Sequence, residues 1–276
     1  MPYRNAPYYM LGVIGILILG FWPSYFAVAT NVPWQFHAHG VAASLWVLTV
    51  TTQSWTAQHK KQLPLHRSVG KASLFLFPFL TGGLAAIISR QGQDFVAGDP
   101  VNLLYGPGFM IGTVVAIVAY VTVYYRALKY RRKVWVHAGY MLSTPLILFE
   151  SPFSRVMGLY IPRFQVHGPA DFPRVMQTIL LSCAIELVII GFIWWRVRDR
   201  AKPFLVTGGL IIVEVMALAF ASEFPVLKRL DLFIGHAPGT PIWLMGFAIG
   251  AATSWAGWEA GKQPTVPVAA AAAQPA

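Results

Sequence analysis

Charged side chains are scarce in this chain of 276 residues, where they make up only 11% of the sequence. A typical soluble domain carries about 25%. Hydrophobic residues reach 56% instead, and water does not tolerate that much apolar surface. These proportions exclude a soluble globular enzyme and a disordered chain, and they predict an integral membrane protein.

Cysteine is almost absent, since Cys183 stands alone inside an apolar run. One cysteine excludes an intramolecular disulfide and a cysteine-rich metal site, so we expect Cys183 to be a packing residue. The chain also lacks an HExxH motif, clustered histidine boxes, a phosphate-binding Walker loop and a GxSxG turn. The sequence therefore gives no support to a zinc protease of that type, a membrane di-iron hydroxylase, a P-loop enzyme or an α/β-hydrolase.

Long apolar runs dominate what is present. A helix needs about 20 apolar residues to cross a bilayer, and eight stretches qualify. They lie at approximately 8–29, 36–57, 69–89, 107–128, 134–157, 174–195, 204–223 and 241–258. The sequence predicts an all-α, polytopic transmembrane bundle of about eight spans. We expect a single helical domain over residues 1–261 and a disordered tail over 262–276.

Basic residues are divided unequally between the predicted loops. If the N-terminus is cytoplasmic, 15 of the 21 Lys and Arg fall on the inner side and 6 on the outer side. The positive-inside rule then places both termini in the cytoplasm of a bacterial inner membrane. The net charge of +11 therefore indicates orientation in a lipid bilayer, and we expect no nucleic-acid partner.

Two histidines are predicted to lie at the same depth on the inner side. His66 precedes the third predicted helix and His137 opens the fifth. Neutral imidazole is a common axial ligand of haem iron, so this pair is a candidate site for haem b. Arg67 and Arg132 would neutralise the haem propionates. The alternative is that the histidines are interfacial and the cations only anchor the inner side.

A second pair, His37 and His39, opens the second predicted helix on the outer side. Residues two apart on a helix do not share a face, so both bind one metal ion only where the helix start is frayed. His37 and His39 are therefore candidate metal ligands. The preferred interpretation is a hydrogen-bonded polar site, with Gly40 allowing a close approach of neighbouring structure.

Three carboxylates, Glu150, Glu186 and Glu214, fall inside the fifth, sixth and seventh predicted spans. Because ionisable residues are costly within a membrane, each of them is a candidate for a functional role such as proton relay or cation binding. Arg155 would pair with Glu150 if the helix is distorted at Pro152. The alternative is a structural glutamate bonded to a hydroxyl or a main-chain carbonyl.

Three motifs occur in order: FHAHG at 36–40, LHRSVG at 65–70 and a basic run leading to HAGYM at 137–141. They resemble a group of uncharacterised bacterial multi-pass membrane proteins with FHAHG, LHRxLG and HKRLM motifs. The last motif departs from that pattern after His137. The group is distantly similar to cytochrome b-561-like b-type cytochromes and to cytochrome oxidase assembly proteins of the membrane, which implies haem between helix histidines. This chain lacks the four-histidine set of a diheme cytochrome.

Two kinds of function are compatible with these features. The first is a b-type haem-binding electron-transfer or respiratory accessory protein, with respiratory-chain proteins as partners. The second is a non-redox proton- or ion-coupled carrier that uses the intramembrane glutamates. An accessory subunit of a larger membrane complex is the third reading, and the sequence does not decide whether the protein is an enzyme.

The charge bias makes a direct prediction about topology. A reporter that is active only in the periplasm should be inactive when fused to the C-terminus, whereas a reporter active only in the cytoplasm should be active there. The same reporters inserted beside Arg163, in a predicted outer loop, should behave in the opposite way. Periplasmic activity at the C-terminus would contradict the predicted orientation.

Overall fold

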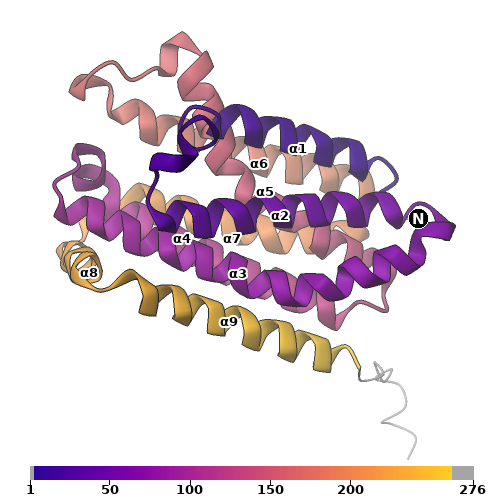
Figure 1. The fold of residues 1–276 in the computed structure, drawn as a ribbon. Coiled ribbons are helices and arrows are strands. Elements are labelled where there is room, and N and C mark those ends of the chain that lie inside the picture. The colour runs from indigo at the N-terminus through magenta and orange to yellow at the C-terminus, as the bar shows by residue number, and fades with distance from the viewer. Residues whose placement is uncertain (1–2, 263–276) are drawn as a thin grey trace, which may run out of the picture.

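The computed structural model describes residues 3–262, which form nine α-helices and no strand (Figure 1). This confirms the all-α prediction. Residues 263–276 of the predicted disordered tail lie outside the described residues. The helices are α1 (Ala6–Phe21), α2 (Trp34–Thr56), α3 (Leu63–Val96), α4 (Pro100–Lys129), α5 (Val134–Tyr160), α6 (Pro173–Val197), α7 (Lys202–Phe220), α8 (Pro225–His236) and α9 (Gly239–Ala260).

The eight stretches predicted from the sequence fall on α1 to α7 and on α9. The first prediction was wrong at its C-terminal end, because α1 ends at Phe21 rather than near residue 29. Pro23 has no amide hydrogen and cannot donate to the carbonyl four residues earlier. The chain continues instead as a 3-10 turn, η1 (Phe26–Asn31).

Helix α8 was not predicted. It has only 12 residues and carries Lys228, Arg229 and Asp231, so it is too short and too polar to read as a span. It meets α9 at an angle of 106°. The chain turns at Pro238, which precedes the first residue of α9.

The centre of the molecule is a four-helix group made by α2, α3, α4 and α5. Each of these helices packs on the next in chain order, and α5 also contacts α2. Helix α1 lies on α2 and α5, the pair α6 and α7 covers α5 and α4, and α9 covers α3 and α4 (Figure 1). Helix α8 crosses the C-terminal end of α3.

Several helices are long and apolar enough to cross a membrane. Three helical stretches meet that test: Lys60–Val96, Pro100–Lys129 and Pro169–Glu223. The last contains both α6 and α7, which pack side by side. The bent pair of α8 and α9 adds a fourth if it is taken as one broken span. Membrane residence follows from these lengths, whereas the number of eight spans stays a prediction.

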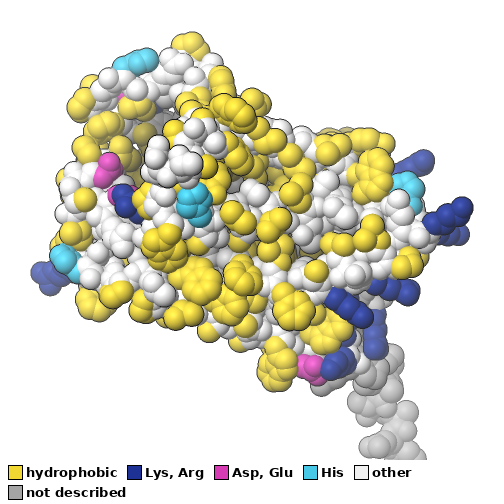
Figure 2. Space-filling view, in the orientation of Figure 1, with side chains coloured by type: hydrophobic (Ala, Val, Ile, Leu, Met, Phe, Trp, Pro, Cys, Tyr) yellow, Lys and Arg dark blue, Asp and Glu magenta, His cyan; other side chains and the backbone are white. Residues whose placement is uncertain are grey.

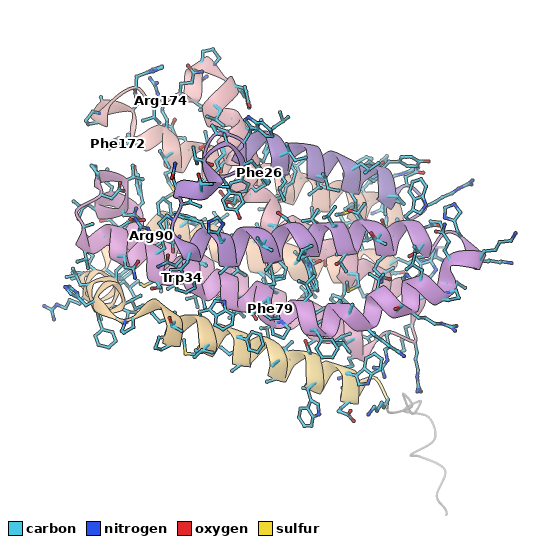
Figure 3. All side chains as sticks on the ribbon, in the orientation of Figure 1. Phe26, Trp34, Phe79, Arg90, Phe172 and Arg174 are labelled. Carbon is cyan, nitrogen blue, oxygen red and sulfur yellow. The ribbon has the colours of Figure 1, made fainter. Side chains whose placement is uncertain are left out.

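The two ends of the bundle differ in charge. The start of α1, the connection from α2 to α3 and the end of α9 lie together, and Lys and Arg side chains gather at this end (Figures 1 and 2). We call it the basic end and its opposite the far end. At the far end Arg90 and Arg174 (Figure 3) are each neutralised in an ion pair, with Asp94 and Asp171.

Glycine allows close helix contacts, as two positions on α3 and α9 show. A Cβ at Gly83 of α3 would lie 2.7 Å from the carbonyl oxygen of Ala38 and from the Cα of His39, both on α2. A Cβ at Gly250 of α9 would lie 2.7 Å from the Cα of Pro78 on α3. Main-chain atoms cannot swing aside as a flexible side chain can, so any larger residue must push the helices apart.

Gly83→Ala should therefore destabilise the fold by about 1–3 kcal/mol, the usual cost of overpacking. Thermal unfolding of the purified protein in detergent measures this. The matched control is Gly209→Ala on α7, where a Cβ would meet nothing within 4 Å, and this variant should unfold at or above the wild-type temperature. Equal stability of the two variants would contradict the packing argument.

Candidate functional site

The inner histidine pair lies at the basic end of the four-helix group. His66 is in the first turn of α3 and His137 is in the first turn of α5. These two helices stand at opposite corners of the group, since each packs on α4 and α2. Both imidazoles are half-buried, and they lie close enough for the charge of one to act on the other. Tertiary packing therefore places the two predicted haem ligands at the same end of the four-helix group, within electrostatic reach of each other.

Each imidazole of this pair is oriented by a main-chain carbonyl. The Nδ1 of His66 lies 3.2 Å from the carbonyl oxygen of Gln53, and the Nδ1 of His137 lies 2.9 Å from that of Ala127. A carbonyl only accepts hydrogen bonds, so Nδ1 carries the hydrogen in both rings. The lone pair of each neutral ring is then on Nε2, as in most metal-ligating histidines.

The surroundings of the pair are polar and basic. The amide of Gln53 donates to the carbonyl oxygen of His66 over 2.8 Å, which joins the end of α2 to the start of α3. Arg67 and Arg132 are exposed, and the charge of Arg67 acts on His66. The cation that acts on His137 is Arg131, the first residue of the basic run that precedes His137. Arg131 stacks over the ring of Trp258 at 4.3 Å and donates to the Trp258 carbonyl.

The fit of a haem depends on the ligand set and on space. Two axial imidazoles suffice for a six-coordinate haem iron, and the pair supplies two free Nε2 positions. A bare metal ion is a poorer match, because the described residues contain no group of three or more His, Cys, Asp or Glu close enough to hold one. The ligand set of the histidine pair is therefore the one that an axially ligated haem uses.

The centre of the four-helix group has no room for a cofactor. Trp46, Phe77, Tyr120 and Tyr124 are all fully buried there; we call these four residues the aromatic layer. The rings of Phe77 and Tyr124 stack at 4.2 Å, and the indole nitrogen of Trp46 donates to the Thr144 hydroxyl over 3.0 Å. Any cofactor at the histidine pair therefore lies between this layer and the basic end.

The outer histidines, His37 and His39, have different neighbours. The Nδ1 of His37 is 3.1 Å from the hydroxyl of Tyr25. His39 faces the region of Arg155, and its Nδ1 is buried without a hydrogen-bond partner among the described residues. The preferred interpretation as a hydrogen-bonded site matches His37. The structure does not bring the two rings to a shared ligand.

The three intramembrane glutamates lie together in the interior between α5, α6 and α7. Glu186 is 1% exposed, Glu214 is 9% exposed and Glu150 is half-buried. The charge of Glu150 acts on both of the others, and that of Glu214 acts on Glu186. We call these three residues the carboxylate cluster.

Arg155 does not form the ion pair with Glu150 that we expected. Its guanidinium donates to the Ser151 carbonyl over 2.9 Å and to the Ser151 hydroxyl over 2.8 Å. It also lies over the ring of Phe21, with 4.8 Å to the centroid. The helix through Pro152 stays continuous, so Glu150 and Arg155 are not brought into contact. The charge of Arg155 still acts on Glu150.

Two surface recesses lie elsewhere, one of about 500 Å³ and one of about 480 Å³. The first is lined by Trp34 and Phe79 (Figure 3) with Ala38, Thr240 and Trp243. The second lies between α3, α4, α8 and α9 and has an entirely apolar lining. Neither lining includes a histidine or a carboxylate, so the recesses are separate from both polar sites.

Asp231 is a buried carboxylate that the sequence did not reveal. It is fully buried on α8, neither of its oxygens has a partner among the described residues, and it faces Gly106 of α4. Burial raises the pKa of this carboxyl to about 6. In the sequence, Asp231 lies in a short amphipathic segment, and a segment of that length and charge is also typical of a loop.

No family model matches this chain, and neither a curated protein nor a solved structure shows significant similarity to it. The interpretation of the site therefore depends on its own geometry.

Asp231 predicts a pH dependence of stability. Its folded-state pKa of about 6 exceeds the ordinary value of 3.8, so the folded chain holds this proton more tightly than the unfolded chain. The corresponding stability is complete below 3.8 and is lost as the pH rises through about 6, by at most about 3 kcal/mol. Asp231→Asn should abolish that loss in thermal unfolding measured across this range. Glu223→Gln, at an exposed position, should keep it; an unchanged pH profile in Asp231→Asn would refute the assignment.

Proposed function

We propose that this chain is a membrane redox protein that holds a b-type haem at the basic end of the bundle, with His66 and His137 as axial ligands. One observation supports the proposal best. Two imidazoles from opposite helices lie within electrostatic reach of each other, and each has its Nδ1 bonded to a main-chain carbonyl. That arrangement leaves both Nε2 atoms available to iron.

The protein residues would act on the site in three ways. The carbonyls of Gln53 and Ala127 fix the tautomer and the ring orientation and make each imidazole a better donor to the iron. Arg67 and Arg132 would balance the negative charge of the propionates at the membrane surface. The aromatic layer would close the site toward the centre of the bundle. When bound, the haem would supply one-electron transfer.

The proposal includes an orientation and a location. Eight spans with both termini in the cytoplasm of a bacterial inner membrane would place the histidine pair near the cytoplasmic surface. The common location of the start of α1 and the end of α9 supports this orientation (Figure 1), as does the gathering of cations there (Figure 2). Soluble or membrane-bound respiratory-chain proteins would then reach the haem from the cytoplasmic side.

A proton- or ion-coupled carrier is the second candidate, and the carboxylate cluster favours it. Three acidic side chains from three helices converge inside the bundle without an ion pair among the described residues. A carrier of this type needs no haem. The optical spectrum of the pure protein therefore separates the two functions.

The purified protein should show the reduced-minus-oxidised difference spectrum of a b-type cytochrome. His66→Ala and His137→Ala should each abolish or severely reduce that spectrum, because a bis-histidine haem loses one of its two axial ligands. The matched control is His59→Ala. The Nδ1 of His59 also lies near a carbonyl, that of Trp55, at 3.0 Å, but this ring is exposed and has no histidine opposite it.

The control variant should keep the full spectrum. A colourless, well-folded wild-type protein purified from haem-replete cells would reject the proposal, and so would full haem loading in the double variant of His66 and His137.

A further inference from the structure

The carboxylate cluster places three acidic groups in the interior of the protein, where several negative charges are unfavourable. Glu150, Glu186 and Glu214 come from three different helices and act on one another. Like charges that share an interior of low dielectric disfavour ionisation of more than one member. The cluster must therefore be neutralised, either by cations or by protons.

Cations of the protein are too few. Arg155 is the cation whose charge acts on the cluster, through Glu150, and its donors point at Ser151. The other ionisable neighbours are Tyr120 on α4 and Cys183 on α6, which carry no positive charge. His39 on α2 lies beyond Arg155. One guanidinium balances one carboxylate, so two carboxylates remain without a counter-charge.

The space around the cluster limits what a ligand can be. Glu186 is 1% exposed and Cys183 is fully buried, and the described residues hold no set of three or more side chains close enough to bind a metal ion. An organic cation would need a cavity, and the two recesses described above lie elsewhere. A proton is the cation that needs no additional space.

A second observation also indicates that the carboxyl group of Glu186 carries a proton. The Oε1 atom of Glu186 is buried and has no hydrogen-bond partner among the described residues, while its carboxyl lies against the main chain of Glu150. An ionised oxygen left in that state would be very costly within a membrane. A carboxylic acid avoids the buried charge.

We propose that the carboxylate cluster is a proton-binding site that holds two protons at neutral pH, on Glu186 and Glu214, with Glu150 ionised opposite Arg155. Glu150 is the member within reach of the Ser154 hydroxyl and of the Arg155 charge, and both interactions favour its anion. Binding is a simple protonation of each carboxylate, with no change of oxidation state. The site lies on α5, α6 and α7 and does not depend on haem.

Infrared spectroscopy of the full-length protein in lipid nanodiscs tests this. Protonated carboxylic acids give a carbonyl band that shifts on transfer to D2O, whereas carboxylates do not. At about pH 7, one unit above the pKa of Asp231, about nine-tenths of that residue is ionised. The six other acidic residues are in ion pairs, cap a helix or are exposed: Asp94, Asp99, Asp171, Asp199, Glu223 and Glu259. A band under these conditions therefore reports the cluster.

The wild-type protein should show this band, and Glu186→Gln and Glu214→Gln should each remove about half of its area, since each removes one of two acids. Glu150→Gln should not enlarge it, because that substitution removes the ionised member, and the control Glu223→Gln should leave it intact. Arg155→Gln should enlarge it, because Glu150 then takes up a proton as well. Glutamine has nearly the same shape as glutamate, so the Glu→Gln variants should keep the fold. The band of the wild-type protein tests the proposal without any variant.

Absence of the band in folded wild-type protein would overturn the proposal. Full retention of the band in the double variant of Glu186 and Glu214 would do the same. The outcome is separable from that of the haem proposal: a colourless protein with the band rejects the haem alone, and a haem-loaded protein without the band rejects the proton site alone.

Discussion

The packing of four aromatic side chains at the centre of α2, α3, α4 and α5 is the constraint on which the rest of the structure depends. Trp46, Phe77, Tyr120 and Tyr124 come from three helices and are fully buried. The polar atoms of this layer are satisfied internally, by Thr144 for Trp46 and Tyr120 and by Ser73 for Tyr124. Water is absent at this depth of a membrane, so each of these bonds replaces one that solvent would otherwise supply.

The interior holds two polar regions. The histidine pair lies on α3 and α5 at the basic end. The carboxylate cluster lies on α5, α6 and α7. Helix α5 carries a member of each region, His137 in its first turn and Glu150 about three and a half turns later. A redox site and a proton site would thus share one helix.

Much of the fold could be predicted from composition and run length. The apolar runs predicted α1 to α7 and α9, because a span must be long and apolar enough for the bilayer. Helix α8 was not predicted, because its length and charges are as typical of a loop as of an amphipathic helix. The predicted end of α1 lay too far toward the C-terminus. The sequence stays apolar beyond Pro23, but the hydrogen bonds of the helix end before it. Asp231 was missed because it stands in no distinctive motif.

What the sequence determined by itself was the class of the protein, an all-helical membrane chain, and the residue types available for chemistry. Hydropathy and charge act locally along the chain, so they can be read without coordinates. Only the tertiary structure decided that His66 and His137 lie at the same end of one four-helix group, that His37 and His39 have different neighbours, and that the charges of three glutamates act on one another. Those relations depend on which helix faces lie opposite one another, and that depends on close packing between segments far apart in the chain, as where Gly83 lets α3 approach α2.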